Sequence, residues 1–340
     1  MSAAVSGLGQ PGPEHLDTPR DLRTRVEPAD RLFRGAARGS GAVVLAIMLL
    51  VGVFLGYRAA EALRVAGWSF LTTSAWEPDS HHFGIAAVLT GTVLIGLVAI
   101  TFAVPLALGT ALYISEYAPR RLRRTLISLV DLMAAVPSVV YGLWGAFFLQ
   151  GQVVGLSRWI ATYFGWIPLF EVDGADPGDP LATTTVYTSS TFIAGMVVAL
   201  MVTPIACSVM REAFSQAPVG EREGALALGG TKWGMIRAVV LPFGLGGVIG
   251  GTMLGLGRAL GETIAVYMII SPVFAVQPHL LQNGANSVSA LIALRYGSAS
   301  DFGMSALMAA GLALFLMTLV VNFIASSIVA RSRSGVGAEA

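Results

Sequence analysis

The run GIAAVLTGTVLIGLVAITFAVPLALGTALYI extends from Gly84 to Ile114 without a single charged residue. A transmembrane helix needs roughly 20 mostly apolar residues, so this run predicts a membrane span with length to spare. Pro105 lies inside it, and the proline together with the excess length favours a helix that is tilted, kinked or longer than the bilayer is thick. The stretch therefore indicates that the chain crosses a membrane.

The composition of the whole chain points the same way. Of its 340 residues, 55% are hydrophobic and 12% are charged, whereas soluble domains carry roughly 25% charged residues. The apolar runs with the composition of membrane spans cover residues 41–57, 84–114, 126–150, 186–210, 243–271 and 303–330. We therefore predict an all-α polytopic membrane protein with six transmembrane helices.

The basic residues predict how these spans are oriented. Sixteen of the 21 Lys and Arg residues fall in the tails, residues 1–40 and 331–340, and in the connections 115–125 and 211–242. Because cytoplasmic loops carry an excess of Lys and Arg, we expect both tails to be cytoplasmic. The first span lacks the short basic start and the small-residue cleavage site of a signal peptide, so we expect an uncleaved anchor.

Several classes of function find no support in the sequence. A net charge of +1 gives no basic excess for binding nucleic acid. The single cysteine, Cys207, excludes an internal disulfide and a multi-cysteine metal centre. His81 and His82 are adjacent in a polar stretch that is typical of a solvated loop. We expect no metal site and no cofactor on this chain.

The segments outside the spans differ in character. Residues 1–20 and 332–340 have the composition of disordered tails. The acidic stretch 171–179 contains Gly and Pro and is typical of a solvated loop. Residues 64–83 mix aromatic and polar side chains. The aromatic residues are expected either to anchor the chain at the membrane interface or to form a docking ledge for an external partner.

The connection 211–242 contains an ordered motif. Residues 223–228 favour a helix, the pair Gly229-Gly230 interrupts it, and residues 231–240 can form a second helix. Pro242 suits the start of the next span, where its missing N–H costs least. We predict a helix–turn–helix elbow outside the membrane; the alternative is an amphipathic helix lying on the headgroups.

The fifth span carries a pair of charges inside an otherwise uncharged run. Gly247, Gly251 and Gly255 recur every four residues, which allows another helix to approach closely. Arg258 and Glu262 continue this stripe, four residues apart and so on one helix face. A charge in mid-membrane faces a water-filled path or a partner, and an arginine suits a tetrahedral oxyanion. The alternative is an Arg–Glu bridge that only locks helices together.

Glu262 has two expected roles in the path hypothesis: it would neutralise Arg258 when no substrate is present, and it could accept a proton from a protonated phosphate. In the third span, Pro137 and Ser138 are expected to bend the helix, and the Ser138 hydroxyl is an additional candidate for lining the path. Asp131, near the cytoplasmic end of that span, is expected to cap or snorkel instead of lining the path.

Three segments resemble known proteins. The connection 211–242 resembles the EAA loop of ABC importer permeases, and the residues that match are Glu223, Ala225, Gly229, Leu241 and Pro242, with Gly224 and Val239 in place of the usual Ala and Ile. GLGRALGETIAV (255–266) and AVPSVVYGLWG (135–145) are similar to segments of PstC, a permease family of phosphate ABC importers. The residues after GET favour PstC over its paired permease, PstA.

The resemblance implies the fold of a type I ABC importer permease and the function of a permease subunit in an ATP-driven phosphate importer of the bacterial inner membrane. It implies a PstA-like permease, two copies of a PstB-like ATP-binding subunit and a PstS-like phosphate-binding protein as partners. The connection 211–242 would dock into the ATP-binding subunit. ATP and Mg²⁺ would be used there, since the sequence here lacks the Walker A order of Gly, Lys and Ser/Thr.

Three other functions stay open from the sequence. Another oxyanion importer, of the sulfate or molybdate type, would share the EAA loop but is not expected to carry GRALGET together with PSVVYG. An ATP-independent channel or secondary transporter would use Arg258 and Glu262 as an ion relay, but it leaves the EAA spacing unexplained. A membrane scaffold that reports phosphate status to a kinase is compatible with transport.

Overall fold

The computed structural model describes residues 28–174 and 184–333. The predictions for residues 1–20, for residues 334–340 of the predicted tail 332–340 and for most of the acidic loop 171–179 therefore lie outside the described residues. Residues 332 and 333, expected in the disordered tail, are helical. Contacts within the chain divide it into residues 1–51 and 52–340. In the first unit the described part is the beginning of a long helix, α1 (Pro28–Ala66). All other elements belong to the second unit.

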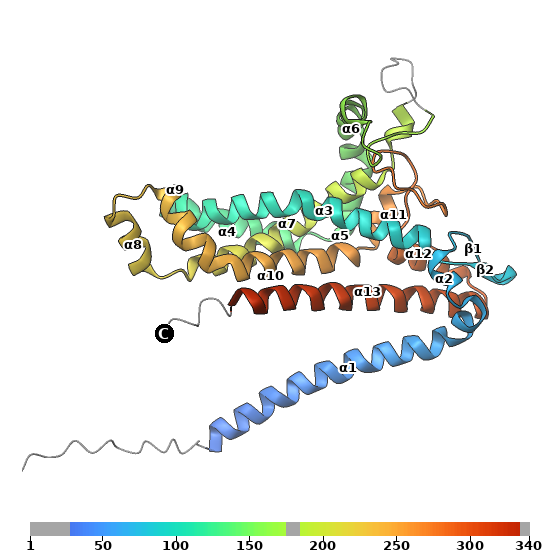
Figure 1. The fold of residues 1–340 in the computed structure, drawn as a ribbon, viewed down its shortest axis with the longest axis horizontal. Helices are drawn as coiled ribbons and strands as arrows, with labels where there is room; N and C mark the ends of the chain where they lie inside the picture. The colour runs from blue at the N-terminus through green and yellow to red at the C-terminus, as the bar shows by residue number, and fades with distance from the viewer. Residues whose placement is uncertain (1–27, 175–183, 334–340) are drawn as a thin grey trace, which may run out of the picture. The chain divides into compact units, whose positions relative to one another are not determined.

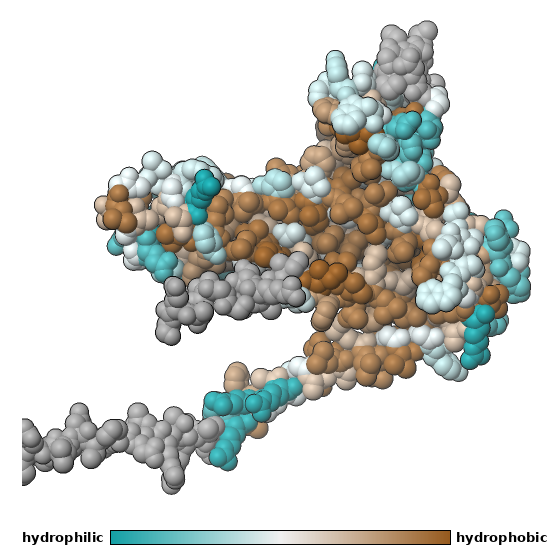
Figure 2. Space-filling model, in the orientation of Figure 1, coloured by the Kyte–Doolittle hydropathy of each residue, from teal (hydrophilic) through white to brown (hydrophobic). Residues whose placement is uncertain are grey.

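Six helices of the described residues are long and apolar enough to cross a membrane, as the composition predicted. They are Ala29–Ala66, Ala86–Tyr117, Ser138–Phe164, Thr191–Ser215, Lys232–Leu260 and Asp301–Ile324. In the second unit, apolar residues cover most of the side drawn in Figure 2, and polar residues gather at the two ends of the helices. This distribution is that of a multi-pass membrane protein.

Figure 1 gives the arrangement of the elements. The spans of the second unit are built from α3 (Ala86–Leu112) with the π-helix η2 (Tyr113–Tyr117), α5 (Ser138–Trp144) with η3 (Gly145–Leu149) and α6 (Gln150–Phe164), α7 (Thr191–Ser215), α9 (Lys232–Met235) with η5 (Ile236–Val240) and α10 (Leu241–Leu260), and α13 (Asp301–Arg333). The shorter elements are α2 (Ser69–Thr72), β1 (Trp76–Glu77), η1 (Pro78–Ser80), β2 (His82–Phe83), α4 (Arg120–Ala135), η4 (Thr184–Tyr187), α8 (Val219–Ala227), α11 (Ile264–Ile269), α12 (Val288–Arg295) and η6 (Tyr296–Ser298).

The core is a three-helix assembly of α3, α7 and α10, with α7 as its most buried member. α3 and α7 run parallel, because Gly195 near the start of α7 lies against Ile95 and Val98 of α3. Their later turns meet around Ala111 and Met210. α10 runs antiparallel to both. The connection between α7 and α10 therefore lies at the end where α3 finishes, and in Figure 1 this end holds α8 and α9.

Glycines let α10 approach α7 closely. A Cβ on Gly247 would lie 2.1 Å from the Cβ of Ala213, and a Cβ on Gly255 would lie 2.5 Å from Val202. Gly251 faces the carbonyl oxygen of Ala206 at 3.0 Å from a Cβ position. All three glycines of the four-residue repeat thus lie on the contact with α7, where small residues permit close helix packing in membranes.

This packing gives a first prediction. Gly247→Val should lower the free energy of unfolding by about 1–3 kcal/mol, because the larger side chain cannot be accommodated without moving one helix. Gly250→Val is the matched control, since a Cβ at Gly250 meets nothing within 4 Å. The measurement is the denaturation midpoint of the two purified variants. An equal midpoint for both would contradict the close α7–α10 contact.

The third span begins later than predicted. The run 126–150 was expected to be one span, but the chain breaks at Val136 and Pro137, which have extended backbones, and the apolar helix is Ser138–Phe164. The residue before a proline avoids the helical region, and proline cannot donate the helical hydrogen bond. The expected bend at Pro137 is confirmed. The residues before it form a separate amphipathic helix, α4, that packs against α7.

The fifth span differs at both of its ends. It begins at Lys232 and runs through Pro242 instead of starting there, and the π-helical turn η5 lies directly before the proline. It ends at Leu260 instead of residue 271. Residues 261–263 are not helical, and the short helix α11 follows. Non-helical backbone at membrane depth is tolerated where protein buries it or where it lines a water-filled cavity.

Candidate functional site

Arg258 lines a cavity between three spans. The cavity has a volume of about 560 Å³, and its walls come from α7, α10 and α13. Its lining residues are Ile205, Met253, Leu254, Gly257, Arg258, Thr318 and Asn322. Arg258 is exposed to this space even though it lies within an apolar helix. The cavity therefore combines one fixed positive charge, two neutral polar side chains and apolar walls.

Arg258 and Glu262 do not form the expected pair. They were predicted to share one helix face, but α10 ends at Leu260 and Glu262 lies in the break that follows. In the part of the chain that the structure describes, no carboxylate lies within ion-pair distance of Arg258. The physical reason is the sequence Gly261-Glu262-Thr263, in which a glycine ends one helix and a polar side chain begins the next.

Glu262 has a structural position instead. Its side chain is 8% exposed, and its Oε1 accepts a hydrogen bond of 3.2 Å from the backbone N–H of Ala265. Its carbonyl oxygen accepts a hydrogen bond of 2.8 Å from the Ser289 hydroxyl. Glu262 thus satisfies a free N–H at the start of α11 and ties the break to α12. It does not line the Arg258 cavity, so its expected role in neutralising Arg258 has no support in this geometry.

Ser138 is half-buried at the first position of α5 and does not line the Arg258 cavity. One turn further, Tyr141 lies within electrostatic range of Arg258, and its hydroxyl donates a hydrogen bond of 3.0 Å to the carbonyl of Met133 in α4. Tyr141 thereby bridges the break at Pro137. Asp131 accepts a hydrogen bond of 3.5 Å from Ser208 of α7, so it joins α4 to α7 and lies outside the cavity.

The connection 211–242 contains the predicted helix and glycine turn, but the predicted second helix, 231–240, is the beginning of the fifth span, Lys232–Leu260. α8 carries Glu223 and Ala225, and the chain turns at Gly229, whose φ of +82° favours glycine. The Thr231 side chain then accepts a hydrogen bond of 3.1 Å from the N–H of Gly234 and caps α9. Leu241 and Pro242 lie further along, at the first turn of α10.

The surface of this elbow is both exposed and partly apolar. Glu223 is exposed, Ala225 is half-buried and Leu228 is 92% exposed. Val219 and Trp233 are also exposed. Isolated exposed apolar residues are common on proteins, but a short helix and a tight turn that present several of them together mark an interaction surface. α8 has no fully buried residue of its own.

An ion pair that the sequence analysis missed holds α8 in place. The Nη2 atom of Arg222 lies 3.3 Å from Oε1 of Glu116 in η2 and donates a hydrogen bond of 2.5 Å to the carbonyl of Phe214. The Glu116 side chain is 5% exposed. Arg222 therefore joins α8 to the ends of both α3 and α7. Close by, the Lys232 ammonium lies 4.7 Å from the centre of the Tyr117 ring.

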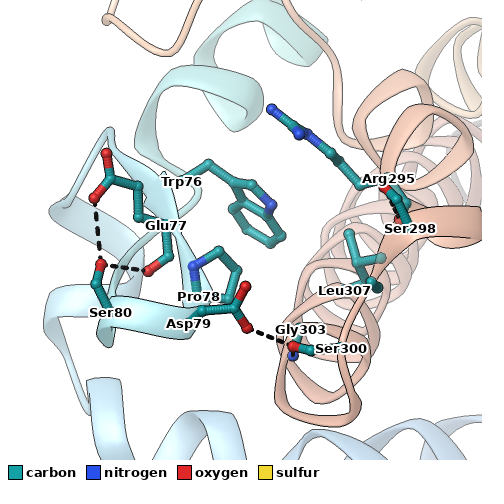
Figure 3. A pocket seen from close by; sticks show the side chains of 11 residues that line it. Trp76, Glu77, Pro78, Asp79, Ser80, Arg295, Ser298, Ser300, Gly303 and Leu307 are labelled. Atoms are coloured by element: carbon teal, nitrogen blue, oxygen red, sulfur yellow. Dashed lines mark hydrogen bonds between the residues drawn. The ribbon is translucent and has the colours of Figure 1, made fainter.

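A second pocket lies at the opposite end of the second unit. It has a volume of about 470 Å³ between the β1–β2 hairpin and the start of α13. Figure 3 shows Glu77 and Asp79 on one wall and Arg295 on the other. Asp79 accepts a hydrogen bond of 2.5 Å from Ser300, which fixes the hairpin to α13. Trp76 is buried and lines this pocket, so it is not exposed as an anchor or docking ledge, whereas Trp68 of the same stretch is 88% exposed.

The sequence contained weak signals for the residues that were missed. Thr318 and Asn322 are polar residues in the mostly apolar run 303–330, and such residues are unfavourable in a membrane unless they have a role. Glu116 ends an apolar run and Arg222 lies in the elbow, but nothing in the sequence pairs them. Among residues 28–174 and 184–333, no cluster of three His, Cys, Asp or Glu side chains has the geometry of a metal site.

Relatives of the chain are permeases. Phosphate transport system permease protein PstC 2 of Mycobacterium tuberculosis is 37% identical over 93% of this chain and 97% of its own length. PstC of Mycobacterium leprae is 40% identical over 88% of this chain and 92% of its own length. PstC of Xylella fastidiosa strain 9a5c is 36% identical over 92% of this chain and 94% of its own length.

Solved structures show the same fold. A chain of a bacterial alginate ABC transporter aligns with a TM-score of 0.58 and 15% identity, over 90% of this chain and 97% of that one. A chain of the MetNI methionine ABC transporter aligns with a TM-score of 0.51 and 16% identity, over 73% of this chain and 95% of that one. At this identity the likeness concerns the fold alone, which is that of the ABC importer permeases, as the EAA resemblance implied.

The family model described as "Binding-protein-dependent transport system inner membrane component" matches residues 103–336. This match includes α7, the elbow, the cavity and all of α13. Together with the identity to the PstC permeases along nearly the whole chain, it shows that the chain belongs to this family of ABC transporter membrane subunits and groups with PstC within it.

Proposed function

We propose that this chain is a permease subunit of an ATP-driven importer of inorganic phosphate in a bacterial inner membrane, with both termini in the cytoplasm. The observation that carries the proposal is Arg258, a cation without a carboxylate partner among the described residues, in a cavity within the spans. A cation in this position favours an anionic ligand, because a charge within a membrane span is unfavourable unless a partner or water compensates it. Because the PstC relatives are named as phosphate transport permeases, we propose that this anion is phosphate.

The elbow supports coupling to a separate ATP-binding subunit. α8 and its glycine turn present exposed side chains at one end of the spans, and the Arg222–Glu116 pair fixes α8 to α3. A partner that pushes or pulls α8 therefore moves the ends of α3 and α7 with it. We propose that two PstB-like subunits use ATP and Mg²⁺, and that this chain contributes the mechanical contact and no hydrolytic site.

The remaining partners follow from the two other surfaces. Arg258 and Asn322, which line the cavity, are exposed in this chain, so a PstA-like permease is proposed to complete the path. At the opposite end, the pocket between β1–β2 and α13 carries Glu77, Asp79 and Arg295. A PstS-like phosphate-binding protein is proposed to dock on this polar end. Signalling of phosphate status is compatible with these contacts, but no separate feature of the structure favours it.

The Arg222–Glu116 pair gives a second prediction. Arg222→Ala should lower the free energy of unfolding by about 3–5 kcal/mol, because the substitution leaves the buried Glu116 carboxylate without its partner. It should also reduce phosphate uptake. Glu116→Gln in the same chain should recover part of both losses, since it removes the unpaired charge. The measurements are uptake and thermal denaturation of the two variants.

The control for this pair is Arg34→Ala. Arg34 and Asp30 form an exposed ion pair at 3.0 Å within α1, and such pairs contribute about 0–1 kcal/mol. A normal uptake rate in Arg222→Ala would contradict the role of this pair in transmission. A failure of Glu116→Gln to recover either quantity would show that the side chain of Arg222 acts in some other way.

Complementation tests the proposed function as a whole. Cells whose own phosphate importer is deleted would receive the genes for this chain and its three partners, and growth on limiting phosphate would be measured. Growth that needs a functional ATP-binding subunit is the expected result. If the cells accumulate sulfate or molybdate but not phosphate, the permease fold stands and the substrate is wrong. If phosphate enters without the ATP-binding subunit, the chain is a channel or secondary transporter.

A further inference from the structure

The last span contributes two polar side chains to the Arg258 cavity. Thr318 and Asn322 are four residues apart on α13 and so lie on one face of the helix, and both line the cavity. The Oδ1 atom of Asn322 lies 3.9 Å from the position of a Cβ on Gly257. The amide therefore lies against α10, next to the residue that precedes Arg258.

These side chains are available to a ligand. Thr318 donates its hydroxyl hydrogen to the carbonyl of Phe315 at 2.9 Å, so its oxygen can only accept further hydrogen bonds from the cavity. No protein group within the described part of the chain bonds the Asn322 amide. Asn322 is exposed in this chain. A polar side chain without partners inside a membrane span is unfavourable, so the amide needs a ligand, a water or a group of the second permease to satisfy it.

The cavity offers both donors and acceptors. Arg258 can only donate, and Asn322 has two N–H donors and one carbonyl acceptor. With the Thr318 oxygen, the cavity therefore presents donors for the bare oxygens of an anion and acceptors for a hydroxyl. Fully ionised sulfate has no hydrogen to give. Phosphate and arsenate near neutral pH carry at least one hydroxyl, so they can satisfy both kinds of group.

We propose that Asn322, assisted by Thr318, is a specificity-determining residue of the translocation path. It favours tetrahedral oxyanions that carry a hydroxyl group over those that are fully ionised. The inference rests on the proposed function, because it assumes that substrate passes Arg258. The sequence suggested that Glu262 accepts a proton from a protonated phosphate; here an amide on another span accepts a hydrogen bond from the phosphate hydroxyl instead. A site whose polar groups hydrogen-bond a hydroxyl of the substrate discriminates against an analogue without that hydroxyl.

The test reads the site directly, without the external binding protein. The purified complex of this chain with its permease and ATP-binding partners is treated with an arginine-selective dicarbonyl reagent. Modification of Arg258 is followed by mass spectrometry at increasing concentrations of inorganic phosphate, arsenate or sulfate. The quantity compared is the anion concentration that gives half-maximal protection. Phosphate uptake by the complete complex, with the binding protein added, is measured in parallel.

In the wild-type complex, phosphate and arsenate should protect Arg258 at about tenfold lower concentration than sulfate, which corresponds to about 1.4 kcal/mol. In Asn322→Leu, the concentrations of phosphate and sulfate that give half-maximal protection should differ by no more than about twofold. In Thr318→Val, the difference between these two concentrations should shrink about threefold. Each effect is the size expected for losing one neutral hydrogen bond. Asn322→Asp keeps the size of the side chain and should weaken protection by both anions at least about tenfold through repulsion. Ser327→Ala is the control, because its hydroxyl bonds to its own helix outside the cavity.

Two results would overturn the inference: equal protection by phosphate and sulfate in the wild type, or an unchanged ratio in both Asn322→Leu and Thr318→Val. Asn322→Asp keeps the test decisive if Asn322→Leu fails to assemble, because full protection in Asn322→Asp would place the amide outside the site. Failure of the proposed function looks different. In that case the complete wild-type complex takes up no phosphate, whatever the Asn322 variants do.

Discussion

Arg258→Ala should reduce phosphate uptake by at least about 100-fold while the complex still assembles, a loss of about 2.8 kcal/mol at 1.4 kcal/mol per tenfold change. This is the size expected for losing hydrogen bonds to a charged group, about 1.5–3 kcal/mol. The reason lies in the cavity: Arg258 supplies its only charge among the lining residues. Without it, an anion would enter an apolar space with two neutral polar groups.

Two variants make this result specific. Arg258→Lys should retain part of the uptake, because it keeps the charge but loses the planar fork that donates two hydrogen bonds to an oxyanion. Thr252→Val should transport normally, since Thr252 lies on the same helix, bonds to the carbonyl of Val248 at 2.8 Å and does not line the cavity. Full uptake by an assembled Arg258→Ala complex would contradict the proposal that phosphate passes through this cavity.

Glu223→Lys should abolish uptake by breaking the contact with the ATP-binding subunit, without unfolding the chain. Glu223 is exposed on α8, and no hydrogen bond or ion pair joins it to another described residue. A charge reversal there therefore acts on a partner and not on the fold. We expect at least a tenfold fall in uptake and in the amount of ATP-binding subunit that copurifies, about 1.4 kcal/mol or more.

Glu221→Lys is the matched control for Glu223→Lys. Glu221 is exposed on the same helix, two residues away and therefore on nearly the opposite face. The same change of charge there should leave copurification within about twofold, by the usual size of exposed charge effects. Equal losses in both variants would mean that the overall charge of the elbow matters and that Glu223 has no special contact. Normal coupling in both would contradict docking at this face.

The sequence predicted those features that depend on local composition. Charge-free runs indicate spans because membrane helices need a fixed apolar length, and the break at Pro137 follows from the covalent geometry of proline. The turn at Gly229 has the positive φ that a glycine after a short helix suggests. The elbow was predictable for the same reason, since each of its parts is determined within a few residues.

Features that depend on distant residues were missed or misplaced. Helical spacing predicted that Arg258 and Glu262 form a pair. Instead, the helix ends at Leu260, and Ser289 of α12, 27 residues after Glu262, donates a hydrogen bond to the carbonyl of Glu262. Gly91 is another residue whose close neighbour lies far away in the sequence, because a Cβ there would lie 2.0 Å from the carbonyl oxygen of Asn286. Asn322 reaches the cavity only because α13 packs against α10. Spacing along one helix cannot reveal such partners.

ATP-driven phosphate uptake by the reconstituted complex tests the central claim most directly. The chain would be purified with its permease and ATP-binding partners, placed in liposomes that contain ATP and Mg²⁺, and supplied outside with the binding protein and radiolabelled phosphate. The account predicts accumulation that requires internal ATP, is unaffected by excess sulfate and disappears with Arg258→Ala. Accumulation of sulfate in place of phosphate, or phosphate flux without ATP, would contradict it.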